Sequence, residues 1–387
     1  MRTHFTLIAY TSFYAEEVSM LRMTIGPTRI APSVLAKTAL HPPAINDPDF
    51  LKTFAECTRD LRVVHGIEKG LMHIIPATGT MGMEILAASF APPRSRVAVF
   101  STGMWGDRWT ESCRRMGLDT HRISVNARGP IDYGILAETV AKHGIKTIFC
   151  TQVDSSSGLI LDLYEIGRIA KKNGAMLLVD GICGAGCEKM DQDGWGVDVL
   201  LTSTPKAVGV PCGLIMISTS DRATEFLKTR AWDPWTFSLD LKPWVPVMEA
   251  HNKGEFGYVQ SPAGNLVNAL HEGLRLIVTE GVGPRTARHE RLRAELHQGL
   301  ERLGLEILVK DPQYRSNGVT VILYPQGRDP SFIGALLKNG LMLPGGTHPE
   351  YGAKTFRIGH FGNVTPEDIS TTLSVLEKTL KETAQSA

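Results

Sequence analysis

Residues 146–180 read KTIFCTQVDSSSGLILDLYEIGRIAKKNGAMLLVD, and this stretch decides the fold. Two short apolar runs, KTIFCT (146–151) and AMLLVD (175–180), flank a helical pattern that ends in Lys-Lys-Asn-Gly, a typical helix stop. Continuous apolar runs of this length are typical of strands that are covered on both faces. The order strand, helix, strand therefore predicts a β-α-β unit in a parallel sheet.

The same alternation continues on both sides of this unit. Further strands are predicted at RVAVFS (96–101), VDVLLTS (197–203) and GLIMIS (213–218). From about residue 264 the pattern changes to two long amphipathic helices, followed by short strands and helices. We therefore expect an α/β fold with a mainly parallel sheet and a smaller C-terminal α+β domain. The predicted boundaries are an N-terminal extension (1–24), a large domain (25–281) and a small domain (282–387).

Composition excludes several classes of partner. The chain has 387 residues, and its 41 basic and 40 acidic side chains give a net charge of +1, which argues against nucleic acid or an anionic membrane as the main partner. No apolar run approaches the ~20 residues that cross a bilayer. The six cysteines are scattered, and Cys183 and Cys187 lack a second ligand pair, so no metal site is predicted. We expect a cytoplasmic protein, with a mitochondrial or peroxisomal location left open.

Reactive or anion-binding residues follow the predicted strands. Asp180 ends the run AMLLVD, and Lys206 follows VDVLLTS in an otherwise uncharged stretch, LLTSTPKAVGVPCGL (200–214). Ligands of parallel sheets bind at the carboxyl ends of the strands. Three more features follow strands or precede a helix, namely Ser155 to Ser157, the sequence Thr78-Gly79-Thr80, and Trp105 between two glycines.

Together these residues suit a ligand with a phosphate, a flat ring and a carbon that reacts with an amine, and pyridoxal phosphate meets all three demands. Lys206 would form the Schiff base, which removes the cost of burying an ammonium group. Asp180 would pair with the ring nitrogen, Trp105 would stack on the ring, and residues 78–80 would hold the phosphate at a helix start. Each residue alone also has a structural reading as a turn, cap, core or solvated residue.

The chain resembles the class V, fold-type I pyridoxal-phosphate-dependent aminotransferases, most closely the alanine–glyoxylate (serine–pyruvate) group. The matching stretches run from IGPTRIAPSVL (25–35) to FRIGHFGNVTPEDI (356–369). They include ATGTMGMEILAAS, STGMWGDRW, STPKAVGVPCG and LDLKPWVPVMEAHNKGEFGYVQSP in the family's order. The resemblance implies a fold-type I enzyme, in which a seven-stranded, mainly parallel sheet carries the cofactor and a smaller C-terminal domain completes the site.

The resemblance also implies roles for residues that the patterns alone leave open. Ser155 matches the hydroxyl near the ring oxygen, Arg357 the arginine that binds the substrate carboxylate, and Gly26 a loop close to the substrate. Tyr258 and Ser261, in YVQSP, match an element that reaches the phosphate of the neighbouring subunit, which implies a homodimer with shared active sites. Pro205 departs from the family, which commonly has glutamine before the lysine, and proline offers no amide group to the phosphate.

The implied activity is transfer of an amino group from alanine or serine to glyoxylate or pyruvate, with Lys206 as the base. The family leaves alternatives open, namely a 2-aminoethylphosphonate–pyruvate or ureidoglycine–glyoxylate transaminase. A pyridoxal-phosphate lyase or another specialised-pathway enzyme would use the same fold. A phosphate-binding protein without enzymatic activity is a further alternative.

Overall fold

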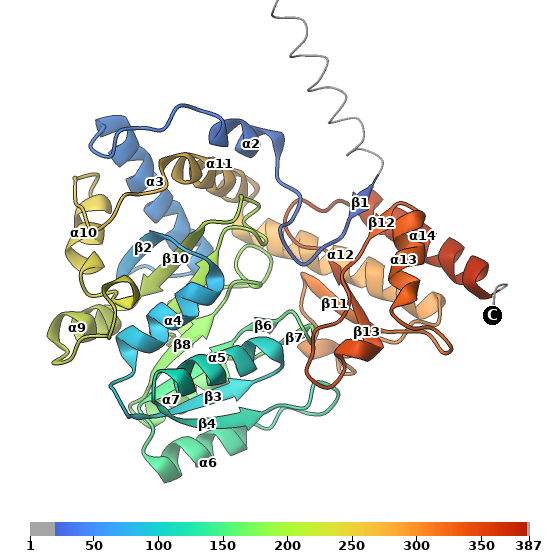
Figure 1. Cartoon of the computed structure of the whole chain (residues 1–387), viewed down its shortest axis with the longest axis horizontal. Coiled ribbons are helices and arrows are strands. Elements are labelled where there is room, and N and C mark those ends of the chain that lie inside the picture. Colours follow the sequence, from blue (N-terminus) through green and yellow to red (C-terminus); the bar gives the residue numbers. More distant parts are fainter. Residues whose placement is uncertain (1–19, 385–387) are drawn as a thin grey trace, which may run out of the picture.

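A seven-stranded sheet forms the centre of the large part of the molecule (Figure 1). The computed structural model describes residues 20–384. Within this range the sheet has the order β2-β10-β9-β8-β5-β3-β4. Its strands are β2 (Leu71–Pro76), β3 (Arg96–Ser101), β4 (Asp119–Ser124), β5 (Thr147–Thr151), β8 (Met176–Asp180), β9 (Val199–Ser203) and β10 (Leu214–Thr219).

The sheet is mainly parallel, as predicted. The pairs β4-β3, β3-β5, β5-β8 and β8-β9 are parallel, whereas β10 is antiparallel to both of its neighbours. The carboxyl ends of β2, β3, β5, β8 and β9 therefore lie along the same edge of the sheet. This edge is where every strand-end residue of the sequence analysis is brought together.

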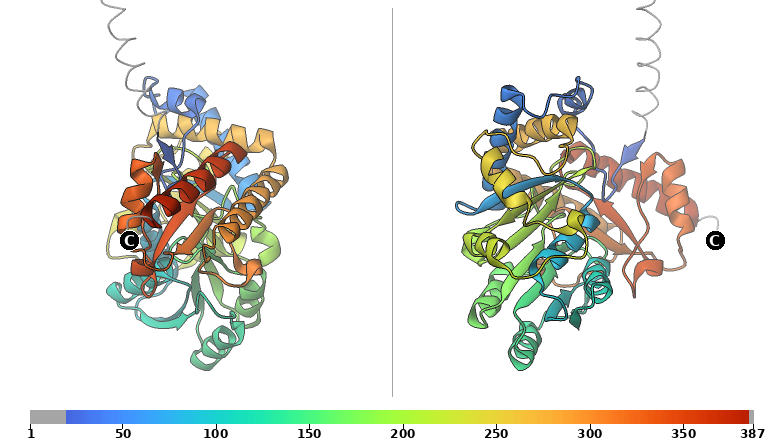
Figure 2. Two further views of the ribbon diagram at one scale, coloured as in Figure 1. Left: turned by 90° about the vertical axis from the view of Figure 1, so that its right-hand side faces the viewer. Right: turned by 60° about the vertical axis from the view of Figure 1, so that its left-hand side comes forward.

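Helices cover both faces of the sheet (Figure 2). On β8, Met176 and Leu178 pack into one core with α3 (Pro48–His65), α4 (Gly79–Phe90), α5 (Met104–Arg115) and α11 (Gly264–Glu280). The alternate residues Leu177 and Val179 pack into a second core with α6 (Tyr133–His143) and α7 (Leu163–Lys172). Because successive strand side chains point to opposite faces, this alternation explains why the strands read as continuous apolar runs.

The C-terminal part has a separate core, built around α12 (Val282–Arg302), α13 (Ser331–Lys338) and α14 (Pro366–Ala384). Strands β11 (Val319–Leu323) and β13 (Thr355–Gly359) pair antiparallel beside these helices. The short β1 (Leu21–Arg22) joins this part by pairing with β12 (Leu341–Met342), as Figure 1 shows at its right-hand side. The predicted division at residue 282 therefore falls at the start of α12.

The remaining elements are short connections. They are α2 (Pro32–Thr38), β6 (Val153–Asp154), β7 (Leu159–Ile160), α8 (Gln192–Trp195), α9 (Asp221–Thr229) and α10 (Trp244–His251), with 3₁₀ turns at Phe237–Leu239, Pro312–Tyr314 and Gly352–Lys354. Across residues 20–384, none of the helices combines the length and the apolar character needed to span a bilayer.

Candidate active site

A cavity that is partly open to solvent lies at the carboxyl edge of the sheet. It is lined by Thr78, Gly79, Thr80, Trp105, Val153, Asp180, Ile182, Cys183, Ser203, Pro205, Lys206 and Cys212. Six of these are residues that the sequence analysis selected, contributed by segments that follow β2, β3, β8 and β9. The fold gathers them because strands of one direction end at one edge.

Lys206 contacts residues 25–28, which precede α2. Its Nζ donates a hydrogen bond of 2.6 Å to the carbonyl of Ile25, and Thr28 Oγ1 donates to the carbonyl of Lys206 at 2.8 Å. Gly26 has φ +134°, and a Cβ there would lie 2.6 Å from Nζ. The backbone conformation favours glycine at residue 26, and any larger side chain there would also force the Lys206 side chain to move.

Asp180 is a buried carboxylate at the end of β8. Oδ1 accepts from the Ile182 amide at 2.9 Å, and Thr151 Oγ1 donates to Oδ2 at 3.4 Å. Burial raises the pKa of Asp180 to about 7, and the nearby Asp154 adds to this, whereas the charge of Lys206 opposes it. A carboxylate in this state is poised to ionise fully when a cation is placed beside it.

Asp154 is a second buried carboxylate that sequence reasoning missed. Oδ2 accepts from the Trp105 amide at 3.0 Å, and Oδ1 accepts from the amide and hydroxyl of Ser156 at 2.9 and 2.6 Å. Trp105 Nε1 in turn donates to Ser155 Oγ at 2.9 Å. Asp154 thus fixes the start of α5 and the serine turn relative to one another. Its position within DSSSG was visible in the sequence, but its partner 49 residues away was not.

We expect Asp154→Asn to lower the free energy of unfolding of the cofactor-free protein by on the order of 2 kcal/mol. The amide replaces one accepting oxygen with an NH₂ group, which would face an N–H or O–H donor. Urea unfolding followed by circular dichroism measures the change. Asp132→Asn is a matched control, because Asp132 is an exposed N-cap of α6 and asparagine caps equally well. Equal stability of the two variants would contradict the role given to Asp154.

Arg357, on β13, reaches the same region from the C-terminal part. Nε donates to the Gly345 carbonyl at 2.8 Å and Nη1 to the Ser155 carbonyl at 3.3 Å. Arg357 is 9 % exposed, and within residues 20–384 it forms no ion pair with Asp or Glu. Burial lowers its pKa, with Cys183 and Asp154 acting in the opposite sense. A buried guanidinium that is held by carbonyls alone retains the capacity to bind an anion.

Two of the sequence-selected residues, Tyr258 and Ser261, stand apart from this arrangement. Tyr258 is 56 % exposed and Ser261 is also exposed, and neither lines the cavity of its own chain. Pro205 does line the cavity, and its carbonyl accepts from the Thr28 amide at 3.2 Å. The departure from glutamine therefore lies at the cavity wall.

Residues 66–370 of this chain match the family model of the class-V aminotransferases. Among characterised sequences, the soluble hydrogenase small subunit of Synechococcus is 31% identical over 366 residues, which are 93% of this chain and 92% of that protein. Alanine–glyoxylate aminotransferase 1 of Saccharomyces cerevisiae is 28% identical over 356 residues, which are 87% and 90% of the two chains.

A solved structure gives the same picture of the fold. The alanine–glyoxylate aminotransferase of Nostoc superimposes with a TM-score of 0.88 at 28% identity, covering 93% of this chain and 95% of that one. The similarity therefore extends over both the central sheet and the C-terminal part.

Proposed function

This chain belongs to the class-V aminotransferase family and has the fold-type I architecture, and on that premise we propose that it moves an amino group from alanine or serine to glyoxylate or pyruvate. The observation that carries the proposal is Lys206, whose amine lines one cavity together with Asp180 and the start of α4. The proposed cofactor is pyridoxal 5'-phosphate, attached through Lys206.

The residues of the cavity fit this cofactor. Lys206 supplies an amine for the aldehyde, and Asp180 supplies a buried carboxylate for a protonated ring nitrogen. The first N–H groups of α4 have no partner within the helix and suit a phosphate. Gly79, at the start of α4, allows Ile182 to pack closely against the helix, because a Cβ at residue 79 would lie 2.6 Å from Ile182 Cδ1.

Bound pyridoxal phosphate supplies an electron-accepting ring, which makes the α-proton of an amino acid acidic. Lys206 acts as the general base that takes this proton and as the acid that later returns one. Asp180 would pair with a protonated ring nitrogen, and a cation at that point would favour the ionised form of the carboxylate. Trp105, which is oriented through its bond to Ser155, would cover one face of the ring.

Arg357 is proposed to bind the substrate's α-carboxylate through parallel hydrogen bonds from its planar guanidinium. Within residues 20–384, Lys206 is the only cation that lines the cavity. This supports small substrates with a single carboxylate, because the second carboxylate of a dicarboxylic substrate would enter the cavity without a cation to pair with. Gly26, beside Lys206, leaves room for the substrate at this point.

The active form is proposed to be a homodimer with shared sites. Tyr258 and Ser261 lie on an exposed segment outside their own cavity. Phe256 on the same segment is 51 % exposed, which suits contact with a second copy of the chain. In this arrangement Tyr258 and Ser261 of each subunit bind the phosphate of the other.

The attachment site is tested by borohydride reduction of the protein with pyridoxal phosphate, followed by peptide mapping. We expect the label on Lys206. A label on a different lysine, or none, would overturn the assignment and favour a phosphate-binding protein without this chemistry.

The donor is tested by following the cofactor's visible absorbance after mixing with single amino acids. Alanine and serine should change the spectrum faster than aspartate or glutamate. A faster response to 2-aminoethylphosphonate or to ureidoglycine would assign one of the related transaminase activities instead.

Arg357→Lys should lower kcat/KM for alanine by roughly 100-fold, because an ammonium group cannot make the two parallel bonds of a guanidinium. Steady-state kinetics measure the loss, and the affinity for pyridoxal phosphate serves as the internal control. An amine without a carboxylate should react at similar rates with both proteins. An equally large loss with that amine would argue against carboxylate binding by Arg357.

A further inference from the structure

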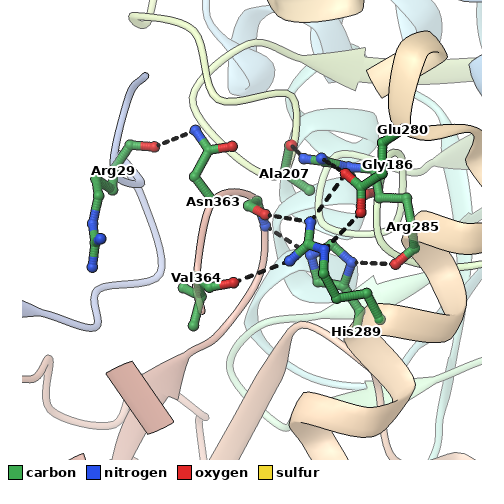
Figure 3. Close-up of polar contacts among 10 residues, drawn as sticks. Arg29, Gly186, Ala207, Glu280, Arg285, His289, Asn363 and Val364 are labelled. Atoms are coloured by element: carbon green, nitrogen blue, oxygen red, sulfur yellow. Dashed lines mark hydrogen bonds and ion pairs between the residues drawn. The ribbon is translucent and has the colours of Figure 1, made fainter. Parts of the chain in front are cut away.

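A cluster of four side chains at the junction of α11 and α12 contacts the loops that carry the active-site residues. We call it the α12 clamp, and it consists of Glu280, Arg285, Arg288 and His289 (Figure 3). Sequence reasoning did not identify it, and none of its members lines the cavity.

Arg285 is the centre of the clamp. It lies in the first turn of α12 and is 4 % exposed. Its Nε donates to the Gly186 carbonyl at 2.8 Å, and its Nη2 donates to the Ala207 carbonyl at 2.9 Å (Figure 3). Gly186 belongs to the loop that follows Asp180, and Ala207 is the residue after Lys206. One planar guanidinium thus bridges the two loops that hold the proposed catalytic pair.

Glu280 balances the charge of this guanidinium. Its Oε2 accepts from Arg285 Nη1 and its Oε1 from Arg288 Nε, both at 2.6 Å. Burial alone raises the pKa of Glu280, but the hydrogen bonds and charges of Arg288 and Arg285 together hold it below its ordinary value. The carboxylate therefore stays ionised, and Arg285 keeps a fixed orientation.

The other two members extend the clamp to the segment after β13. Arg288 donates to the carbonyls of Gly362 and Val364, each at 3.0 Å. His289 Nδ1 donates to the Arg285 carbonyl at 2.8 Å, so its Nε2 is free to accept from the Gly362 amide at 3.0 Å. Burial lowers the pKa of His289 to about 3, which keeps this neutral tautomer at all physiological pH values.

We propose that Arg285 is a positioning residue, which sets the placement of Lys206 by holding the carbonyl of Ala207 against the loop of Asp180. The inference rests on the proposed function, in which Lys206 binds the cofactor and transfers the proton. The clamp also bonds to Gly362, three residues beyond the end of the strand that carries Arg357, so one cluster contacts the segments next to both proposed residues.

The test compares Arg285→Lys and Arg285→Met with Arg293→Met in the full-length protein. Arg293 is a matched control, because it lies on the same helix and donates to a carbonyl, that of Arg315 at 2.8 Å. Three quantities are measured for each protein. They are the stability of the cofactor-free form, the Kd for pyridoxal phosphate, and the pH midpoint of the bound cofactor's absorbance change.

Both methionine variants should be less stable, but only the Arg285 variants should bind pyridoxal phosphate roughly tenfold more weakly. They should also shift the pH midpoint by more than about 0.5 unit. Arg285→Lys should recover stability, since it keeps a charge opposite Glu280, without recovering the affinity, since one ammonium cannot bridge both carbonyls.

The proposal is overturned if Arg285→Lys binds the cofactor and titrates like the wild type or like Arg293→Met. Borohydride labelling of the wild-type protein distinguishes this result from failure of the proposed function. If borohydride does not label Lys206 in the wild type, the proposed function fails and the clamp has no such role. If it labels Lys206 there and the Arg285 variants are unchanged, the positioning role alone fails.

Discussion

Replacing Lys206 with alanine is expected to lower transamination turnover by roughly four orders of magnitude. The reason is that the proposed mechanism uses one amine both as the attachment point and as the group that moves the proton in both directions. A methyl group can do neither, and the Ile25 carbonyl that accepts from Nζ cannot substitute as a base at neutral pH. Single-turnover absorbance measurements with alanine, on protein saturated with pyridoxal phosphate, give the rate.

Lys189→Ala is the control for loss of a lysine, because Lys189 is exposed and lies outside the lining of the cavity. Its turnover should equal that of the wild type. Circular dichroism should be unchanged in both variants, since Lys206 is only half-buried. A Lys206→Ala protein that keeps more than about one-tenth of the wild-type rate would contradict general base catalysis by this residue.

Asp180→Asn is expected to have opposite effects on activity and on stability. Turnover should fall by roughly 100-fold or more, because an amide cannot balance the charge of a protonated ring nitrogen. The cofactor-free protein, in contrast, should become more stable at pH 8 by on the order of 2 kcal/mol. A residue that opposes folding until its ligand is bound is typical of a functional site.

The pH dependence follows from the sign of the shift. Burial raises the pKa of Asp180 from 3.8 to about 7 in the folded protein, so the folded state favours the neutral acid. The stability that this difference contributes is complete below pH 3.8 and is lost as the pH rises through 7. Asparagine does not ionise, so Asp180→Asn should show a flatter stability curve between pH 4 and 8.

Urea unfolding at several pH values, on protein freed of cofactor, measures this curve. Asp162→Asn is the matched control, because Asp162 is an accessible N-cap at the start of α7. Parallel curves for the wild type and Asp180→Asn would contradict the assigned cause of the shift.

The central strands and the long helices could be predicted because they carry strong local signals. The five predicted strands of the sheet, from RVAVFS to GLIMIS, correspond to β3, β5, β8, β9 and β10 within about two residues. Both faces of these strands are buried, and most of their residues are apolar, because an apolar side chain needs no hydrogen-bonding partner when it is buried. The mainly parallel sheet then placed Lys206 and Asp180 at one edge.

The edge strand β4 was not predicted, because its sequence DTHRIS has a single buried residue, Ile123. A strand at the edge of a sheet needs no continuous apolar run, and polar side chains there discourage pairing with other molecules. The strand β2, at the opposite edge, ends in Pro76 and was also missed. The edge argument applies to β4 alone, because five of the six residues of β2 are buried.

Asp154 and the α12 clamp could not be predicted for a different reason. Their side chains act on backbone groups that are remote in the sequence, such as Ala207, which lies 78 residues from Arg285. Carbonyl groups are the same in every residue, so nothing in the sequence marks a partner of this kind. The resemblance did single out Arg357, which contacts the carbonyl of Ser155 from 202 residues away, although its proposed role stays a prediction.

The pairing of β1 with β12 joins the two backbone segments that hold Lys206 and Arg357, the proposed reactive and carboxylate-binding residues. Three residues beyond β1, the Ile25 carbonyl holds Lys206 Nζ. Two residues beyond β12, the Pro344 carbonyl accepts from the amide of Arg357, and that of Gly345 accepts from its Nε. A shift of this ribbon would therefore displace two groups together, the amine proposed to react and the guanidinium proposed to bind the substrate carboxylate.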